Sequence, residues 1–183
     1  MKIIPPAEFI TSVWKNGGGI THEILRHDHD GRLHWRLSIA EVASSGAFSF
    51  FNGCRRCLTV IEGAGMDLVS PQSVYAADFL KPVWFPGSEQ IECRLRDGPC
   101  RDFNLIFDTA EITATLDVLD GNATMAPDSS WRGAYVVEGL ISQGSDVASQ
   151  GSFAILDQDA AVISGTVLLV TIMAMVKSGY ADA

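Results

Sequence analysis

The sequence has no excess of basic residues and no long apolar run. Its 183 residues include 13 Lys and Arg against 22 Asp and Glu, for a formal net charge of -9. Because binding to nucleic-acid backbones or anionic membranes requires a basic surface, we expect neither partner. The most apolar run, residues 167–176, has about half of the ~20 residues that a membrane helix needs. We expect it to form a fully buried final strand, followed by a frayed tail after Lys177.

Cysteine and histidine are also scarce, which limits metal and nucleophile chemistry. The four cysteines are Cys54, Cys57, Cys93 and Cys100. The first pair has the spacing of half a zinc site, but the second pair is too widely spaced to complete it. Reduced, structural cysteines are therefore favoured over a zinc site. All four histidines lie between residues 22 and 34, which weakens the case for a nucleophile activated by histidine. The His-Asp repeat at residues 27–30 indicates a hairpin tip, where we expect adventitious metal binding at most.

No segment shows the period of an amphipathic helix. Turn signals instead recur about every eight to twelve residues, which is typical of an antiparallel sandwich or barrel. A chain of this length can bury about 70% of its unfolded surface, enough for one compact unit or two small fused ones. The Pro5-Pro6 pair falls where a signal peptide would need its apolar core, so we expect a cytoplasmic protein.

Alternation of apolar and polar residues predicts the individual strands. The predicted strands are residues 20–25, 33–42, 47–51, 56–62, 66–69, 91–95, 101–107, 135–139, 152–156 and 162–164. Residues 109–118 alternate weakly. We expect turns at Asn52-Gly53 and at residues 120–122, and an irregular segment at residues 142–151.

A glycine run near the N-terminus carries the strongest local signal. Each glycine costs folding entropy and adds nothing to a core, so three in succession need a reason. One interpretation is a concave set of backbone N–H donors that, with a neighbouring cation and amide, cradles an anion or carboxylate. The other is a flexible hairpin loop. The stretch is Trp14, Lys15, Asn16, Gly17, Gly18 and Gly19.

Two predicted strands carry polar residues on one face of an otherwise apolar segment. Arg36 and Ser38 share one face of residues 33–42, and Asp102 and Asn104 share one face of residues 101–107. Asp and Asn are poor strand formers. These faces either meet solvent or line a polar cavity, where each unpaired polar group would cost roughly 1–3 kcal/mol.

Several blocks together resemble the HutD/Ves family. They occur in the family's order over about the first three-fifths of the chain: residues 14–19 with Thr21 and Glu23, residues 35–42, Phe48-Ser49, residues 56–63, residues 85–87 and residues 102–104. The resemblance implies an all-β double cupin, that is, two antiparallel β-sandwich barrels. Residues 1–107 would form the N-terminal barrel with the pocket, and residues 108–183 a C-terminal barrel that is mainly scaffold. The His-x-His and later ligands of metal-binding cupins are missing from the strands, so we expect no metal or other cofactor.

The resemblance also implies a role in histidine utilisation, as a sensor or governor that binds a pathway intermediate such as N-formylglutamate. Ves members are instead associated with stress and cold. We therefore consider three functions: a non-catalytic ligand-binding protein, a metal-free hydrolase or isomerase with a carboxylate base, and a stress-related partner-binding module with a vestigial pocket. Glu23 and Glu41 are candidate bases, although exposed structural carboxylates are the favoured interpretation. A homodimer is one state that we consider.

The residues and the resemblance agree on a site for a small anionic ligand. Arg36 can hold a carboxylate through two parallel hydrogen bonds, and Arg56 would bind the second end of a dicarboxylate. Ser49 and Asn104 can donate to formyl or amide oxygens, and Asp102 can orient Arg36 or accept from a ligand N–H. Trp14 is expected to be a packing lid. The expected ligand-binding residues are Trp14, Lys15, Asn16, Gly17, Gly18, Gly19, Thr21, Arg36, Ser38, Ser49, Arg56, Asp102 and Asn104.

Overall fold

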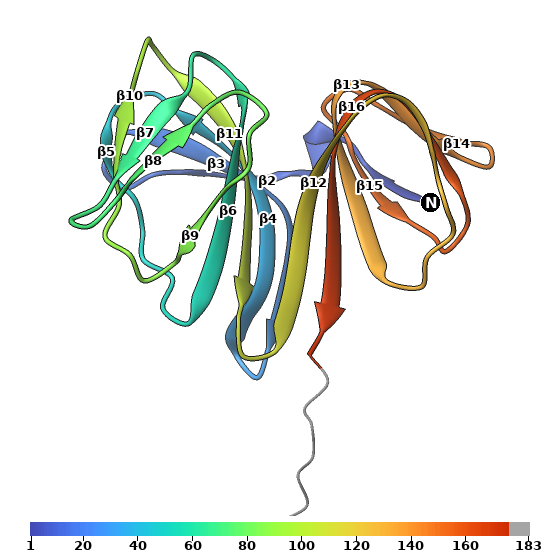
Figure 1. The fold of residues 1–183 in the computed structure, drawn as a ribbon, viewed down its shortest axis with the longest axis horizontal. Helices are drawn as coiled ribbons and strands as arrows, with labels where there is room; N and C mark the ends of the chain where they lie inside the picture. Colours follow the sequence, from blue (N-terminus) through green and yellow to red (C-terminus); the bar gives the residue numbers. More distant parts are fainter. Residues whose placement is uncertain (176–183) are drawn as a thin grey trace, which may run out of the picture.

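The computed structural model describes residues 1–175, and this part of the chain is all-β, as predicted (Figure 1). One turn of 3-10 helix, η1 (Pro6–Glu8), is its only helical segment. The described residues contain no helix long and apolar enough to cross a membrane. The strands are β1 (Lys2–Ile4), β2 (Ile10–Val13), β3 (Gly19–His29), β4 (Arg32–Val42), β5 (Gly46–Ala47), β6 (Cys54–Glu62), β7 (Met66–Val69), β8 (Val74–Ala77), β9 (Val83–Pro86), β10 (Glu92–Leu95), β11 (Cys100–Asp108), β12 (Ile112–Met125), β13 (Trp131–Gln143), β14 (Asp146–Ser149), β15 (Phe153–Leu156) and β16 (Ala161–Ala174).

The strands pair antiparallel in three sheets. Sheet I has the order β2-β3-β4-β11-β6-β9, sheet II the order β5-β10-β7-β8, and sheet III the order β1-β15-β13-β16-β12, with β14 added to β13. Sheets I and II form one lobe, and sheet III forms the other, where β1 lies beside β15 (Figure 1). Each sheet keeps open edges, at β2 and β9, at β5 and β8, and at β1, β12 and β14, so none of the three closes into the barrel that the resemblance implied.

The central strands of sheet I are buried on both faces. Leu37, Phe103 and Leu105 belong to a core cluster that also contains Leu168 and Val170 of sheet III. The opposite face of sheet I packs through a second cluster against sheet II. Because successive side chains of a strand point to opposite faces, the polar residues that alternate with Phe103 and Leu105 on β11 must point toward sheet II. The polar faces noted in the sequence therefore point into the space between sheets I and II and do not face solvent.

Sheet III bends along a row of three glycines. Gly121 and Gly139 both lie opposite Gly165, and φ is +91°, +79° and +115° at Gly121, Gly139 and Gly165. Beyond the bend the sheet encloses a third core cluster of its own. The turn predicted at residues 120–122 is therefore wrong, because β12 continues through Gly121. A glycine inside a strand permits a bend without ending the strand.

The long C-terminal strands also differ from the prediction. Residues 162–164 and 167–174 belong to the single strand β16, and β14 forms a hairpin with β13 inside the segment predicted to be irregular. The apolar run is buried on both faces where it begins, because Val167 and Leu168 are both 0% exposed, but its end is not, because Met173 and Met175 are 41% and 47% exposed. The tail predicted to fray after Lys177 lies outside the described residues.

The predicted aromatic strand at residues 47–51 is also wrong beyond Ala47. After β5 the chain is irregular, and its backbone bonds are single contacts from Phe48 N to Ile91 O and from Phe51 N to Gly87 O. Both rings pack on the guanidinium of Arg56, at 5.4 Å for Phe48 and 5.3 Å for Phe51. A cation–π contact with the next strand, β6, has overridden the local β propensity.

The glycine row yields a stability prediction. A Cβ at position 165 would lie 2.3 Å from the carbonyl oxygen of Glu138, whereas a Cβ at position 121 would meet nothing within 4 Å. Both positions have positive φ, which alone costs a substituted residue about 1–2 kcal/mol. We expect Gly121→Ala to lower the free energy of unfolding by about that amount and Gly165→Ala to lower it by at least ~3 kcal/mol, measured by urea denaturation. Equal losses of stability in the two variants would contradict a close backbone approach at Gly165 that leaves no room for a side chain.

Candidate functional site

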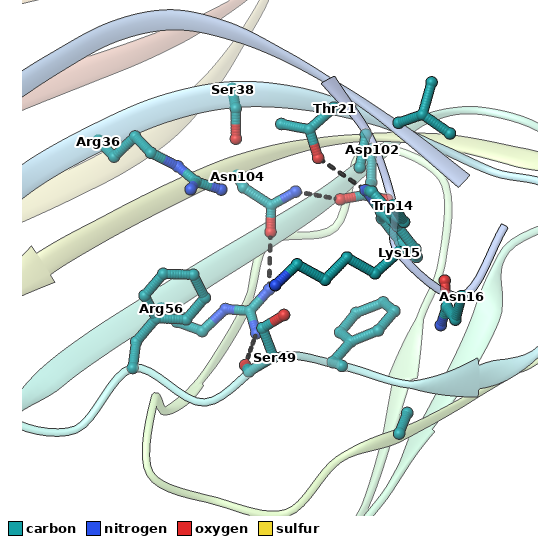
Figure 2. A pocket seen from close by; sticks show the side chains of 15 residues that line it. Trp14, Lys15, Asn16, Thr21, Arg36, Ser38, Ser49, Arg56, Asp102 and Asn104 are labelled. Carbon is teal, nitrogen blue, oxygen red and sulfur yellow. Dashed lines mark hydrogen bonds between the residues drawn. The ribbon is translucent and has the colours of Figure 1, made fainter. Parts of the chain in front are cut away.

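A cavity of about 500 Å³ lies between sheets I and II (Figure 2). Its walls come from the β2–β3 loop, β3, β4, β6, β11 and the irregular segment after β5. All the expected ligand-binding residues except the three glycines line it: Trp14, Lys15, Asn16, Thr21, Arg36, Ser38, Ser49, Arg56, Asp102 and Asn104. The structure thus gathers side chains that are up to 90 positions apart in the sequence into one place.

Strand register explains why these side chains meet. On β11, Asn104 lies opposite Ser38 of β4, and Ile106 lies between Arg36 of β4 and Arg56 of β6. Directly opposed residues of neighbouring strands project to the same face. The polar residues of the central strands therefore form the floor of the cavity, while their apolar neighbours in the sequence form the core with sheet III.

Arg56 is the most deeply buried cation of the cavity. The residue is 6% exposed, and its Nη1 and Nη2 donate to Ser49 O and to Asn104 Oδ1, each at 3.2 Å. Its guanidinium also lies 5.0 Å from the centre of the Phe85 ring. Burial lowers the pKa of Arg56 to about 10, so the side chain is still a cation at neutral pH.

Arg36 supplies a second guanidinium on the same floor. Its side chain is 19% exposed, and its Nε lies 3.9 Å from Glu23 Oε2 at the edge of the site. Burial lowers the pKa of Arg36, and the charge of Glu23 opposes that shift. The guanidinium lies 5.4 Å from the Phe51 ring, which Arg56 also contacts. The exposed Lys15 extends over the cavity from the β2–β3 loop and adds a third cation (Figure 2).

Asp102 and Asn104 form a directional pair beneath the arginines. Asn104 Nδ2 donates to Asp102 Oδ1, and Asn104 Oδ1 accepts from Arg56. Because the two ends of the amide have different partners, its orientation is set. Asp102 is fully buried, and burial raises its pKa to about 7, while the charge of Arg56 and the bond from Asn104 act in the opposite direction.

Several buried polar atoms around the cavity have no hydrogen-bond partner among the described residues. Each such atom costs roughly 1–3 kcal/mol unless something satisfies it. The cavity therefore suits a ligand that brings both negative charge and further hydrogen-bonding groups. The atoms are Arg36 Nε, Arg56 Nε, Ser38 Oγ and Asp102 Oδ2.

The glycine run forms a hairpin loop and does not line the cavity. Gly17 N donates to Trp14 O, and Gly18 N donates to Asn16 Oδ1, so these two N–H groups are used within the loop. A Cβ at Gly19 would lie 2.5 Å from the carbonyl oxygen of Glu41 and 3.1 Å from the Trp14 ring. Gly19 thus allows close packing against Trp14, and the run does not form the anion cradle considered from the sequence.

Trp14 closes one side of the cavity and is itself held in place. Its Nε1 donates to Thr21 Oγ1 at 2.8 Å, and its ring meets Phe48 edge-on with centroids 6.1 Å apart. The aromatic walls Phe48 and Phe51 were not among the expected site residues. The signal that could have identified them is the aromatic cluster directly before the Asn52-Gly53 turn.

The remaining candidates for chemistry lie elsewhere or have structural partners. Glu41 lies 3.1 Å from His22 Nε2 and 3.6 Å from Arg101 Nε. Cys54 and Cys57 are separated by an odd number of positions on β6 and so face opposite sides, and burial raises the pKa of Cys57 to about 12. Within residues 1–175 no three His, Cys, Asp or Glu side chains are grouped to hold a metal ion.

Comparison with known proteins agrees with the resemblance seen in the sequence. The family model HutD matches residues 7–177. The chain is 37% identical over 133 residues to the uncharacterized 21.2 kDa protein in the hutC 3′ region of Pseudomonas putida. The aligned region covers 71% of this chain and 70% of that protein. The chain is 31% identical over 139 residues to protein Ves of Escherichia fergusonii, covering 74% and 72%.

Solved structures extend the comparison to the fold. The structure of HutD from Pseudomonas fluorescens SBW25 (formate condition) is 31% identical, with a TM-score of 0.87 over 96% of this chain and 99% of that one. A cupin 2 conserved barrel domain protein from Leptotrichia buccalis is 12% identical, with a TM-score of 0.58 over 95% and 96%. At that identity the similarity shows a cupin-like fold alone.

The buried carboxyl group predicts an unusual pH dependence of stability. The pKa of Asp102 is about 7 in the folded protein against a usual 3.8, so the folded state holds its proton more tightly than the unfolded state. The Asp102 contribution to the free energy of unfolding therefore falls as pH rises from about 4 to about 7, by ~4 kcal/mol at most. Because Asp102→Asn mimics the protonated acid, its stability gain over the original chain should grow across that range and stay constant above it, measured by urea denaturation.

An exposed carboxylate provides a control of opposite sign. Hydrogen bonds from Arg96 and Lys81 lower the pKa of Asp78, so its stabilising contribution is lost as pH falls. Asp78→Asn should therefore be less stable than the original chain near pH 7 and equally stable in strong acid. A stability difference for Asp102→Asn that does not vary between pH 4 and pH 7 would contradict a buried, protonated Asp102.

Proposed function

The chain belongs to the HutD family, and from this premise we propose that its cavity binds a small carboxylate of histidine utilisation without turning it over. The family name and the hutC-region relative link the family to the histidine utilisation locus. The chemistry of the cavity supports an anionic ligand independently of that link. Arg56, Arg36 and Lys15 contribute three cations, against the buried Asp102 and the peripheral Glu23.

The observation that carries the proposal is the burial of Arg56. Removing a guanidinium from water is expensive, and neutral acceptors offset only part of that cost. The hydrogen-bond acceptors of Arg56 are a backbone carbonyl and an amide oxygen, both neutral. A carboxylate in the cavity would supply the negative charge that the neighbours of Arg56 largely lack, and an arginine fork matches a carboxylate well.

The ligand that we propose is a compact acyl amino acid such as N-formylglutamate. The volume of about 500 Å³ suits a small molecule. Arg36 and Arg56 lie either side of Ile106 on one floor, so one or two carboxylates can meet a guanidinium. Formate, named for the Pseudomonas fluorescens HutD structure, is the smallest carboxylate and a useful probe of the cationic end alone.

Asp102 favours a second candidate, a metal-free hydrolase or isomerase. A carboxyl group with a pKa of about 7 is suited to general acid–base catalysis at neutral pH. Nuclear magnetic resonance of N-formylglutamate incubated with the protein distinguishes the candidates. Release of formate or a change of the carbon skeleton that is absent with Asp102→Asn would establish an enzyme, and an unchanged spectrum would favour binding alone.

We also propose that the two lobes are two cupin-like units joined by residues 109–111, between β11 and β12. The overall likeness to a cupin 2 barrel domain protein supports this division, although β1 pairs with β15 of the second lobe. A cytoplasmic location and a homodimer remain predictions, which cell fractionation and sedimentation equilibrium would test.

The binding proposal predicts a ligand-dependent thermal shift. At a hundred times its dissociation constant, a ligand adds ~2.7 kcal/mol to the free energy of unfolding, which should raise the melting temperature of a chain of this size by about 5–10 °C. We expect such a shift with N-formylglutamate. Arg36→Met removes one guanidinium, and Arg56→Lys keeps a buried cation but loses the fork; each should weaken binding at least about tenfold.

Arg94 provides the matched control. It lies on β10 with its side chain 60% exposed and does not line the cavity, so Arg94→Met should retain the full thermal shift. Unchanged affinity in both Arg36→Met and Arg56→Lys would place any binding elsewhere on the protein. A complete lack of binding by formate, N-formylglutamate and related carboxylates at millimolar concentration would refute the proposed function.

A further inference from the structure

Asp102 is a buried polar group that the carboxylate of a ligand does not explain. An anionic ligand would explain why arginines line the cavity. The floor of the same cavity, however, also contains a fully buried carboxyl group. Its Oδ1 accepts from Asn104, and its Oδ2 has no partner among the described residues. Nothing in the packing of the sheets requires an acid at this position, because the adjacent pairs on β4 and β6 are Ala40 and Val60.

The cavity therefore has two chemically different regions. Arg36 and Arg56 lie at one side, and Asp102 lies at the other, near Trp14, while Lys15 begins beside Trp14 and extends toward Arg56 (Figure 2). Asn104 lies between the two sides with its amide oxygen toward Arg56 and its amide nitrogen toward Asp102. Both ends of that amide are used, and Asp102 Oδ2 is left, among the described residues, as an unpartnered acceptor in the wall of the cavity.

We propose that Asp102 Oδ2 accepts a hydrogen bond from an N–H group of the ligand, and that it thereby selects carboxylates bearing an amide or amine N–H over carboxylates of equal charge without one. This inference rests on the proposed function, since it concerns the other end of the same bound molecule. A site built to receive a hydrogen bond rejects analogues that lack the donor, because its buried acceptor is then left unpaired. A ligand oxygen in place of the N–H would also face the lone pairs of Oδ2.

The charges around Asp102 are compatible with an ionised acceptor when the donor is bound. Arg56 favours the charged form, whereas burial opposes it. An N–H donor stabilises the carboxylate further, so affinity for such a ligand should rise as pH increases through about 7. The titratable or charged side chains toward this part of the cavity are Arg56 on β6, Arg36 on β4, Glu23 on β3, Cys93 on β10 and Lys15 in the β2–β3 loop.

Calorimetric titration with two matched ligands tests the inference. N-formylglutamate and 2-formyloxyglutarate have the same two carboxylates and differ in that an ester oxygen replaces the amide N–H. We expect the amide to bind the original chain about 10–100-fold more tightly than the ester. This preference should be larger at pH 8 than at pH 6, because a proton on Oδ2, the oxygen to which Asn104 does not donate, would turn that acceptor into a donor.

Asp102→Asn identifies the residue responsible. Asn keeps the shape and can still accept from Asn104, but it presents an NH2 donor to the ligand. The variant should lose the preference for the amide and its pH dependence, while binding the ester within about threefold of the original chain. Asp97→Asn, at an exposed turn outside the cavity, is the matched control and should keep the preference.

The outcomes separate this inference from the proposed function. Equal affinities of amide and ester for the original chain, or a preference that persists in Asp102→Asn, would overturn the role of Asp102 and leave carboxylate binding intact. Absence of binding by both ligands would overturn the proposed function and this inference together. If Asp102→Asn fails to fold, the pH dependence of the preference in the original chain decides the question.

Discussion

The burial of the Arg56 guanidinium is the constraint on which the rest of the cavity depends. A cation with 6% exposure needs neighbouring groups that stabilise its charge. The neighbours of Arg56 do this in two ways. Phe48, Phe51 and Phe85 present aromatic rings at 5.0–5.4 Å, and two neutral oxygens accept its N–H groups. The irregular course of the chain after β5 follows from this packing, because both of its inward-facing rings contact the guanidinium.

Sheet I makes this arrangement possible by separating polar from apolar side chains within single strands. One face of β4, β6 and β11 forms the core with sheet III, and the other face forms the cavity floor and the core with sheet II. The bent sheet III thus serves as a support that buries one side of the central strands of sheet I. The sheet that carries the binding residues is therefore held rigidly without any of those residues taking part in the inter-lobe core.

Much of the candidate site could be predicted from the sequence, because the alternation in residues 33–42 and 101–107 directly places Arg36 with Ser38 and Asp102 with Asn104. The family resemblance, confirmed by the HutD model, added Arg56. Which face is covered could not be predicted, since a strand pattern does not identify the sheet that packs on it. The sequence around Gly121 indicates a turn because a bent strand and a turn both use glycine with positive φ. The pairing of Gly121 with Gly165 shows that it lies in a bent strand. The contact of Phe51 with Arg56 spans only five positions, but apolar and polar alternation does not indicate that a ring will pack on a guanidinium.

The most direct test of carboxylate binding at the floor of the cavity is a nuclear magnetic resonance titration that observes the arginine Nε–H groups. The Nε atoms of Arg36 and Arg56 have no hydrogen-bond partner among the described residues, so their signals report directly on a bound anion. With N-formylglutamate, we expect saturable shifts of both signals, with one dissociation constant, and no shift for the exposed Arg94. Shifts confined to exposed arginines, or none at saturating ligand, would contradict carboxylate binding in this cavity.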